Sequence, residues 1–134
     1  MKGTVRVGVG LILFRDGKIL LGKRKNSHGE GSWAFIGGHL ELNESLEQCA
    51  RREAMEEAGI KIKNILFVTA TNDIFKKDGK HYVTLFLRAE YQSGELRNCE
   101  PEKLEKWGWF PPDKLPKPLF IPIQNLLKEK ELTF

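Results

Sequence analysis

Residues 37–60, GGHLELNESLEQCARREAMEEAGI, decide the fold of this chain because they contain a helix with both of its end signals. Ser45 followed three residues later by Gln48 fits a capping box, in which each residue satisfies a backbone N–H of the other. Gly59 is suited to the left-handed conformation that ends many helices. The stretch therefore predicts a helix from about Ser45 to Ala58.

Strands are predicted on both sides of this helix. A strict alternation of apolar residues from Val5 to Leu13 is typical of a half-buried strand. Further strands are expected at residues 18–25, 33–36, 81–91 and 104–110, with one or two more in 62–75 and a C-terminal helix at 121–132. The strand at 33–36 runs into Gly37 and Gly38, where the backbone can bend sharply and let a ligand come close. Strands around one strong helix indicate an α/β or α+β domain with a mixed sheet.

The composition excludes several classes of protein. With 134 residues, 40% of them apolar and 30% charged, we expect one domain over residues 1–134. No apolar run approaches the roughly 18 residues of a membrane span, and the start MKGTVRVGVG lacks the features of a signal peptide. We therefore expect a cytoplasmic location and no membrane partner. Cys49 and Cys99 have no partner at metal-binding spacing and are expected to be reduced thiols.

Three carboxylates of the predicted helix fall on one side of it. Steps of three and four residues place Glu53, Glu56 and Glu57 within an arc of roughly 100°. Like charges this close repel unless a cation neutralises them, and oxygen ligands without His or Cys suit a hard ion such as Mg²⁺ or Mn²⁺. Arg52, four residues before Glu56, is placed to hold that carboxylate. A solvated acidic helix face is the alternative interpretation.

The spacing of glycine and charged residues in this stretch resembles the Nudix box, over residues 38–60. The matching positions are Gly38, Glu44, Arg52, Glu53, Glu56, Glu57, Gly59 and the aliphatic Ile60. Ala54 departs from the pattern where a larger aliphatic residue is usual, and Ile36 replaces a proline that often precedes the glycines. The resemblance implies an α/β/α sandwich with a central mixed β-sheet. It also implies metal-dependent hydrolysis of nucleoside diphosphates linked to another group.

The resemblance also assigns roles within the box. It implies that Glu53, Glu56 and Glu57 bind the metal together with the carbonyl of Gly37. Arg52, Glu53 and Glu56 form the expected catalytic set, with Glu53 as the first candidate for the base that deprotonates the attacking water. Bound metal would lower the pKa of that water and neutralise phosphate charge.

Substrate contacts are expected around this centre. Arg24 can bind phosphate bidentately and Lys23 as a point charge, with a solvated strand end as the alternative. The full set of candidates for substrate binding is Lys23, Arg24, Phe35, Gly38, His39 and Thr84. Further candidates are Trp107 and Trp109 for lining the base, and Glu100 and Glu102 as an extra metal ligand or the base. At least one tryptophan is expected in the core, and a plain acidic loop is the alternative for the two glutamates.

Five strings of residues resemble the MutT-type branch of the family. They are GVG at 8–10, LGKRK at 21–25, GGHLE at 37–41, HYVT at 81–84 and EPEK at 100–103. This branch contains nucleoside-triphosphate diphosphatases. The resemblance therefore implies hydrolysis of normal or modified nucleoside triphosphates to a monophosphate and pyrophosphate, as in sanitation of the nucleotide pool.

Other interpretations stay open. A Nudix hydrolase of nucleotide sugars, dinucleoside polyphosphates or capped RNA would share the box, and a non-catalytic nucleotide-sensing domain is the alternative from another class. Such sensors tend to lose box carboxylates that this chain keeps. A net charge of +4 permits anionic ligands. Because there is no long basic tract, we expect a small-molecule nucleotide as partner and no stable complex with nucleic acid. The preferred base, the choice between Mg²⁺ and Mn²⁺, and formation of a homodimer stay undecided.

Overall fold

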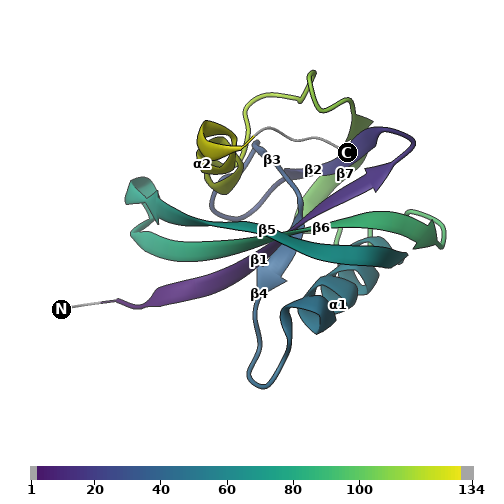
Figure 1. Ribbon diagram of the computed structural model, residues 1–134. Helices are drawn as coiled ribbons and strands as arrows, with labels where there is room; N and C mark the ends of the chain where they lie inside the picture. Colours follow the sequence, from purple (N-terminus) through teal and green to yellow (C-terminus); the bar gives the residue numbers. More distant parts are fainter. Residues whose placement is uncertain (1–2, 131–134) are drawn as a thin grey trace.

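A mixed sheet lies between two helices in the computed structural model, which describes residues 3–130 (Figure 1). The strands are β1 (Val5–Arg15), β2 (Lys18–Arg24), β3 (Trp33–Ala34), β4 (Ile36–His39), β5 (Lys61–Phe75), β6 (Lys80–Ser93) and β7 (Leu104–Phe110), and the helices are α1 (Leu46–Ala58) and α2 (Ile121–Glu129). A short 3-10 turn, η1 (Lys76–Asp78), joins β5 to β6. Figure 1 shows α1 and α2 on opposite sides of the sheet, so the predicted α/β/α arrangement is confirmed.

The sheet is organised around β1. This strand runs parallel to β6 and antiparallel to β2 and β4. The strand order is β3-β2-β1-β6-β5, with β4 added beside β1 and β7 beside β2. A tight turn at Asp16 and Gly17, with φ angles of 50° and 77°, reverses the chain between β1 and β2. One parallel pair among antiparallel ones makes the sheet mixed, as predicted.

Helices cover both faces of the sheet, and β1 is buried between them from Val9 to Phe14. Leu11 and Leu13 belong to the core on the side of α1, whereas Ile12 and Phe14 belong to the core on the side of α2. Successive side chains of a strand point to opposite faces, so both sets are buried at once. The prediction of a half-buried strand is therefore wrong for the second half of β1.

Helix α1 begins and ends where its sequence signals predict. The Ser45 hydroxyl accepts a hydrogen bond from the backbone N–H of Gln48 at 3.0 Å, and the Gln48 side chain accepts one from the Ser45 N–H at 2.8 Å. Gly59 ends the helix with a φ of 70°. The buried face of α1 consists of small residues, Cys49, Ala50, Ala54 and Ala58, which lets the helix lie close against the sheet.

At Gly37 and Gly38 the backbone is an extended strand and not a sharp bend. They lie in β4, where Gly37 pairs with Gly10 and Gly38 with Val9 of β1. Close approach is what requires glycine here: a Cβ on Gly37 would lie 2.6 Å from the carbonyl oxygen of Val9, and one on Gly38 would collide with the carboxylate of Glu53. The strand predicted at 33–36 is accordingly split into β3 and β4.

The bounds of β5 and α2 differ slightly from the predicted ones. Residues 62–75 form a single strand, β5, which begins at Lys61. Helix α2 ends at Glu129, where the extended backbone of Lys130 stops it, and the last predicted helical residues lie outside the described part of the chain. Within residues 3–130, no helix is long and apolar enough to cross a membrane.

Candidate active site

A cavity of about 520 Å³ is lined by residues of the sheet, of both helices and of the loops that connect them. Its volume is within the range of roughly 300–1,000 Å³ that small-molecule sites occupy. Two groups of side chains give the cavity two different chemistries. The carboxylate cluster is Glu53, Glu56, Glu57 and Glu100, and the aromatic cluster is His28, Phe75, Tyr82 and Phe120.

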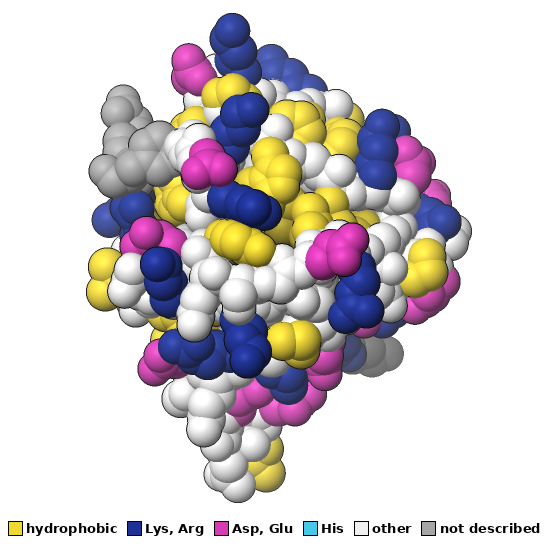
Figure 2. Space-filling view, turned by 90° about the vertical axis from the view of Figure 1, so that its right-hand side faces the viewer, with side chains coloured by type: hydrophobic (Ala, Val, Ile, Leu, Met, Phe, Trp, Pro, Cys, Tyr) yellow, Lys and Arg dark blue, Asp and Glu magenta, His cyan; other side chains and the backbone are white. Residues whose placement is uncertain are grey.

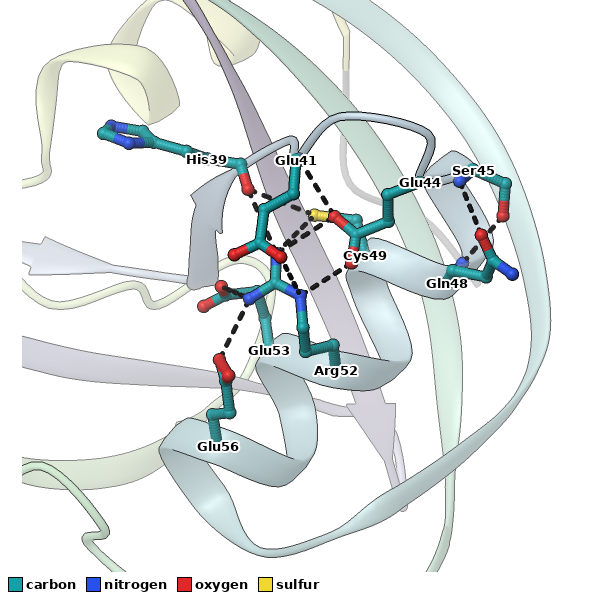
Figure 3. A network of polar contacts seen from close by, with 9 residues as sticks. All are labelled: His39, Glu41, Glu44, Ser45, Gln48, Cys49, Arg52, Glu53 and Glu56. Carbon is teal, nitrogen blue, oxygen red and sulfur yellow. Dashed lines mark hydrogen bonds and ion pairs between the residues drawn. The ribbon is translucent and has the colours of Figure 1, made fainter.

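Arg52, in the middle of α1, binds two members of the carboxylate cluster, Glu53 and Glu56, and also Glu44 (Figure 3). Its Nε donates to Glu44 at 2.6 Å, and its Nη1 donates to Glu53 at 2.6 Å and to Glu56 at 2.9 Å. Its Nη2 donates to the backbone carbonyl of His39 at 3.1 Å. The hydrogen bond from Arg52 lowers the pKa of Glu44 to about 2, so both partners are charged at neutral pH. The predicted contact between Arg52 and Glu56 is present.

Glu57 is half-buried beside β4, where the backbone N–H of Gly37 donates to its Oε2 at 3.0 Å. Burial raises the pKa of Glu57 well above its usual value, and the neighbouring Glu53 carboxylate raises it further, against the opposing effect of the Gly37 N–H. Carboxyl groups this close are favourable together only when a proton or a cation neutralises them. A cluster of carboxylate oxygens therefore fits a hard divalent cation such as Mg²⁺.

The described residues do not already form a complete metal-binding cluster. No three acidic, His or Cys side chains among residues 3–130 converge on one point. Arg52 engages Glu53 and Glu56 in ion pairs of 2.6 and 2.9 Å, which turns these two carboxylates toward the guanidinium. Ligation by both would therefore require them to exchange part of this contact for the cation.

Glu100 reaches the cluster from the loop before β7. This loop is fixed to the end of α1, because the N–H of Arg97 donates to the carbonyl of Ala58 at 3.0 Å and that of Cys99 to the carbonyl of Glu57 at 3.1 Å. Burial raises the pKa of Glu100, Lys103 lowers it, and the box carboxylates raise it again. The structure thus brings Glu100 to the box, 43 residues beyond Glu57 in sequence, counting from 57 to 100.

The aromatic cluster joins four separate segments of the chain. The His28 ring meets Phe75 edge-on, with 4.9 Å between centroids, and lies 5.8 Å from Tyr82 and 5.6 Å from Phe120. Phe75 and Phe120 are 5.4 Å apart. Planar apolar faces of this kind suit an aromatic ring of a ligand.

His39 connects the two clusters. Its backbone carbonyl accepts the hydrogen bond from Arg52, while its Nε2 is 3.1 Å from the hydroxyl of Tyr82. In Figure 3 its side chain points away from the glutamates that surround Arg52. The carboxylate and aromatic clusters are therefore neighbours within one cavity.

Lys23 and Arg24 point to different places, since consecutive strand residues face opposite sides of a sheet. Arg24 lines the cavity, stacks on the ring of Phe120 at 4.2 Å and donates from Nε to the carbonyl of His28 at 3.0 Å. Burial lowers the pKa of Arg24. Among residues 3–130 it has no ion pair, whereas Lys23 lies 3.9 Å from Glu105, outside the cavity. Arg24 is thus the cation of this pair that can meet a bound anion.

A buried carboxylate lies behind the cavity wall. Asp73 is fully buried and accepts hydrogen bonds from the hydroxyls of Thr71 at 3.0 Å and Thr84 at 2.5 Å. The side chain of Asn125 donates to its other oxygen at 2.9 Å, which ties α2 to β5. Thr84 lines the cavity and is held in place by this network.

Most of the predicted site residues lie together. The cavity lining includes Arg24, Phe35, Gly37, Gly38, His39, Arg52, Glu53, Glu56, Glu57, Thr84, Glu100 and Trp107. It does not include Lys23, Glu102 or Trp109, and Trp109 packs against the core on the side of α1, as expected for one tryptophan. Sequence reasoning missed the four residues of the aromatic cluster. Only Tyr82 stood in a quoted string, HYVT, and no local spacing links it to the other three.

Comparisons with known proteins agree with this geometry. The NUDIX domain model matches residues 4–129. The structure of a MutT NUDIX hydrolase from Burkholderia pseudomallei superimposes with a TM-score of 0.87, at 35% identity, covering 98% of this chain and 100% of that one. Among curated proteins, the NAD-capped RNA hydrolase NudC of Chromobacterium violaceum is 36% identical over 106 residues, which is 79% of this chain and 38% of the relative. NudC of Escherichia coli is 39% identical over 102 residues, 76% of this chain and 37% of the relative.

The chain spans about two-fifths of the length of these curated relatives. The family typically uses a divalent metal and acts on nucleotide-type small molecules, which agrees with the chemistry of the cavity. With the NUDIX model matched from residue 4 to residue 129, this chain belongs to the NUDIX family of hydrolases.

Proposed function

We propose that this protein is a metal-dependent nucleoside-triphosphate diphosphatase, which hydrolyses a nucleoside triphosphate to a monophosphate and pyrophosphate. One observation carries the proposal: a single cavity presents a carboxylate cluster beside an aromatic cluster, with His39 between them. A nucleoside triphosphate has the matching two parts, an anionic chain that needs cations and a planar base that needs apolar contacts. The whole of residues 1–134 would form one catalytic domain.

The carboxylate cluster supplies the reaction centre in this proposal. Glu53, Glu56 and Glu57, with the carbonyl of Gly37, would hold Mg²⁺ or Mn²⁺. When bound, the metal acidifies water and offsets the charge that phosphoryl transfer must carry. Arg52 is the positioning residue, because it orients Glu53 and Glu56 through hydrogen bonds of 2.6 and 2.9 Å.

Two carboxylates are candidates for the base that takes the proton of the attacking water. Glu53 is the first, because it lies within the box and against Gly38 of β4. Glu100 is the second, because its pKa is raised by burial and by the nearby carboxylates, which makes it a stronger proton acceptor. Arg24 would bind the phosphate chain, because it is a cation in the cavity that forms no ion pair within the described residues and lies near Glu57 of the carboxylate cluster.

The curated relatives favour a second candidate. They are named NAD-capped RNA hydrolases, so a pyrophosphate bond that joins two nucleosides is the alternative target. The face in Figure 2 shows Lys and Arg interspersed with Asp and Glu around a hydrophobic patch, with no single basic tract. On this face, the mixed charges offer no continuous basic track for a long RNA chain.

The test is a panel of purified substrates with Mg²⁺: nucleoside triphosphates and diphosphates, nucleotide sugars, dinucleoside polyphosphates, and NAD free or as an RNA cap. Products are separated by chromatography. Monophosphate plus pyrophosphate from a triphosphate, at a higher kcat/KM than any other substrate, is the expected result. Faster cleavage of NAD or dinucleotides would overturn the substrate class. Tight nucleotide binding with no cleavage of any substrate would identify a sensor.

A further inference from the structure

The loop between β2 and β3 fixes the position of His28 beside the cavity. The N–H of Gly31 donates to the carbonyl of Arg24 at 2.8 Å, and Arg24 Nε donates to the carbonyl of His28 at 3.0 Å. Gly29, with a φ of 74°, lies so close to Phe120 that a Cβ would be 2.7 Å from its ring. The chain itself therefore holds His28 in place, before any ligand binds.

The His28 ring is a neutral polar group that packs against three aromatic rings. Burial, reinforced by the charges of Arg24 and Lys80, lowers the pKa of His28 to about 4. At neutral pH the imidazole therefore offers one N–H donor and one nitrogen acceptor. Its aromatic neighbours, Phe75 and Phe120, have no polar side-chain atom with which to pair.

Neither ring nitrogen of His28 has a hydrogen-bond partner among residues 3–130. The other two histidines do have one: His39 pairs with Tyr82, and His81 pairs with Asn72. In the described residues, every fully buried side-chain N or O atom has a hydrogen-bond partner, so the unpaired nitrogens of His28 must be accessible. His28 lines the cavity. A ligand in the cavity can therefore supply the missing partner.

We propose that His28 is a specificity-determining residue, whose imidazole reads the hydrogen-bonding edge of the substrate's planar base while the aromatic cluster packs against that base. The inference rests on the proposed function, because it takes the ligand to be a nucleotide whose phosphates lie at the carboxylate cluster. A base with a complementary acceptor and donor pairs with the imidazole. A base with the wrong pattern leaves polar groups unpaired, which sites of this kind reject.

Binding of the four common nucleoside monophosphates tests this inference by isothermal titration calorimetry of the full chain. In the wild type, the Kd values should differ among bases. In His28→Phe, which keeps an aromatic ring without hydrogen bonds, the Kd for the preferred base should weaken about tenfold, as expected for the loss of one hydrogen bond. The Kd values for the other bases should change little, so the spread should shrink by the same factor. His28→Gln, which retains a donor and an acceptor, should keep more of the preference.

His81→Phe is the matched control, because it makes the same change at a histidine outside the cavity, and it should bind like the wild type. The inference is overturned if the wild type binds all four bases equally or none of them. It is also overturned if His28→Phe weakens every base by the same factor or leaves the ranking and spread unchanged. The Kd values are measured with monophosphates and need no turnover. A failure to cleave triphosphates would therefore overturn the proposed function, while the Kd values would still show whether His28 sets the base preference.

Discussion

The two sides of the cavity are assembled from the sequence in opposite ways. In the carboxylate cluster, three of the four glutamates lie within one turn or so of α1, at positions 53, 56 and 57, and Arg52 beside them orients two. In the aromatic cluster, His28, Phe75, Tyr82 and Phe120 come from four segments spread over most of the chain. Most of the proposed reaction centre is thus encoded locally in α1, whereas the proposed base-recognition surface exists only after the sheet has formed.

Glu57→Gln, in the carboxylate cluster, should have the largest effect on activity. We expect kcat for pyrophosphate release to fall about a thousandfold, because the amide keeps the shape but removes the charge of a proposed metal ligand. The fold should survive, since burial and Glu53 already make an ionised Glu57 unfavourable, as its raised pKa indicates. Steady-state kinetics at saturating Mg²⁺ and thermal melting without metal measure the two effects.

Glu47→Gln is the control on the same helix. Glu47 is exposed and pairs only at the surface, at 3.1 Å from Arg51, so this variant should keep the wild-type kcat. A wild-type kcat in Glu57→Gln at saturating Mg²⁺ would show that Glu57 is not a metal ligand.

Asp73→Ala removes the centre of the hydrogen-bond network behind the cavity wall. It leaves the buried hydroxyls of Thr71 and Thr84 and the partly buried amide of Asn125 without their shared acceptor, which should lower the free energy of unfolding by about 3 kcal/mol. Urea denaturation followed by tryptophan fluorescence measures the loss. Asp78→Ala, in the exposed turn η1, should change stability by less than about 0.5 kcal/mol. Equal losses in the two variants would contradict the importance of the buried network.

Gly38→Ala and Gly37→Ala, at adjacent positions, should affect activity and stability respectively. A Cβ on Gly38 would displace the end of the Glu53 side chain, so we expect kcat to fall about a hundredfold with little change in Tm. A Cβ on Gly37 would instead press on the backbone of β1, 2.6 Å from the carbonyl oxygen of Val9, and should lower stability by about 2 kcal/mol. The comparison fails if both variants lose stability equally or if Gly38→Ala retains full activity.

The pH dependence of stability tests the environment of His28 on the aromatic side. The folded pKa of His28 is about 4 against a usual 6.5, so between these values the unfolded chain binds a proton that the folded chain does not. The free energy of unfolding should therefore decrease as pH falls from 6.5 to 4 and lose no more from this group below pH 4. His28 faces Arg24, Lys80 and His39, which oppose its protonation, and Asp78, which favours it.

His28→Phe should remove the pH dependence that His28 contributes to the free energy of unfolding. The difference in this free energy between wild type and variant should therefore vary with pH only between pH 4 and pH 6.5. Denaturation at half-unit steps from pH 4 to pH 8 measures it. Parallel curves for the two proteins would show that His28 is solvated and titrates normally.

Local signals predicted α1 almost to the residue. Ser45, Gln48 and Gly59 act within one turn of the backbone they cap, so the sequence window contains the whole interaction. The sequence showed that the backbone can bend at Gly37 and Gly38, but their pairing in a strand depends on β1, which lies far away in sequence. Lys23 was predicted at the site together with Arg24, and only the sheet decided which of the two faces the cavity.

By itself, the sequence determined the capped helix, the spacing that puts three carboxylates and an arginine on it, and hence the family and its metal-dependent chemistry. The tertiary structure decided the rest of the cavity: the approach of Glu100 to the box, the gathering of the aromatic cluster, and the choice of Arg24 over Lys23. The physical reason is the range of the interactions. Helix periodicity and capping act over three or four residues, whereas strand pairing and loop docking bring together residues that no short spacing relates.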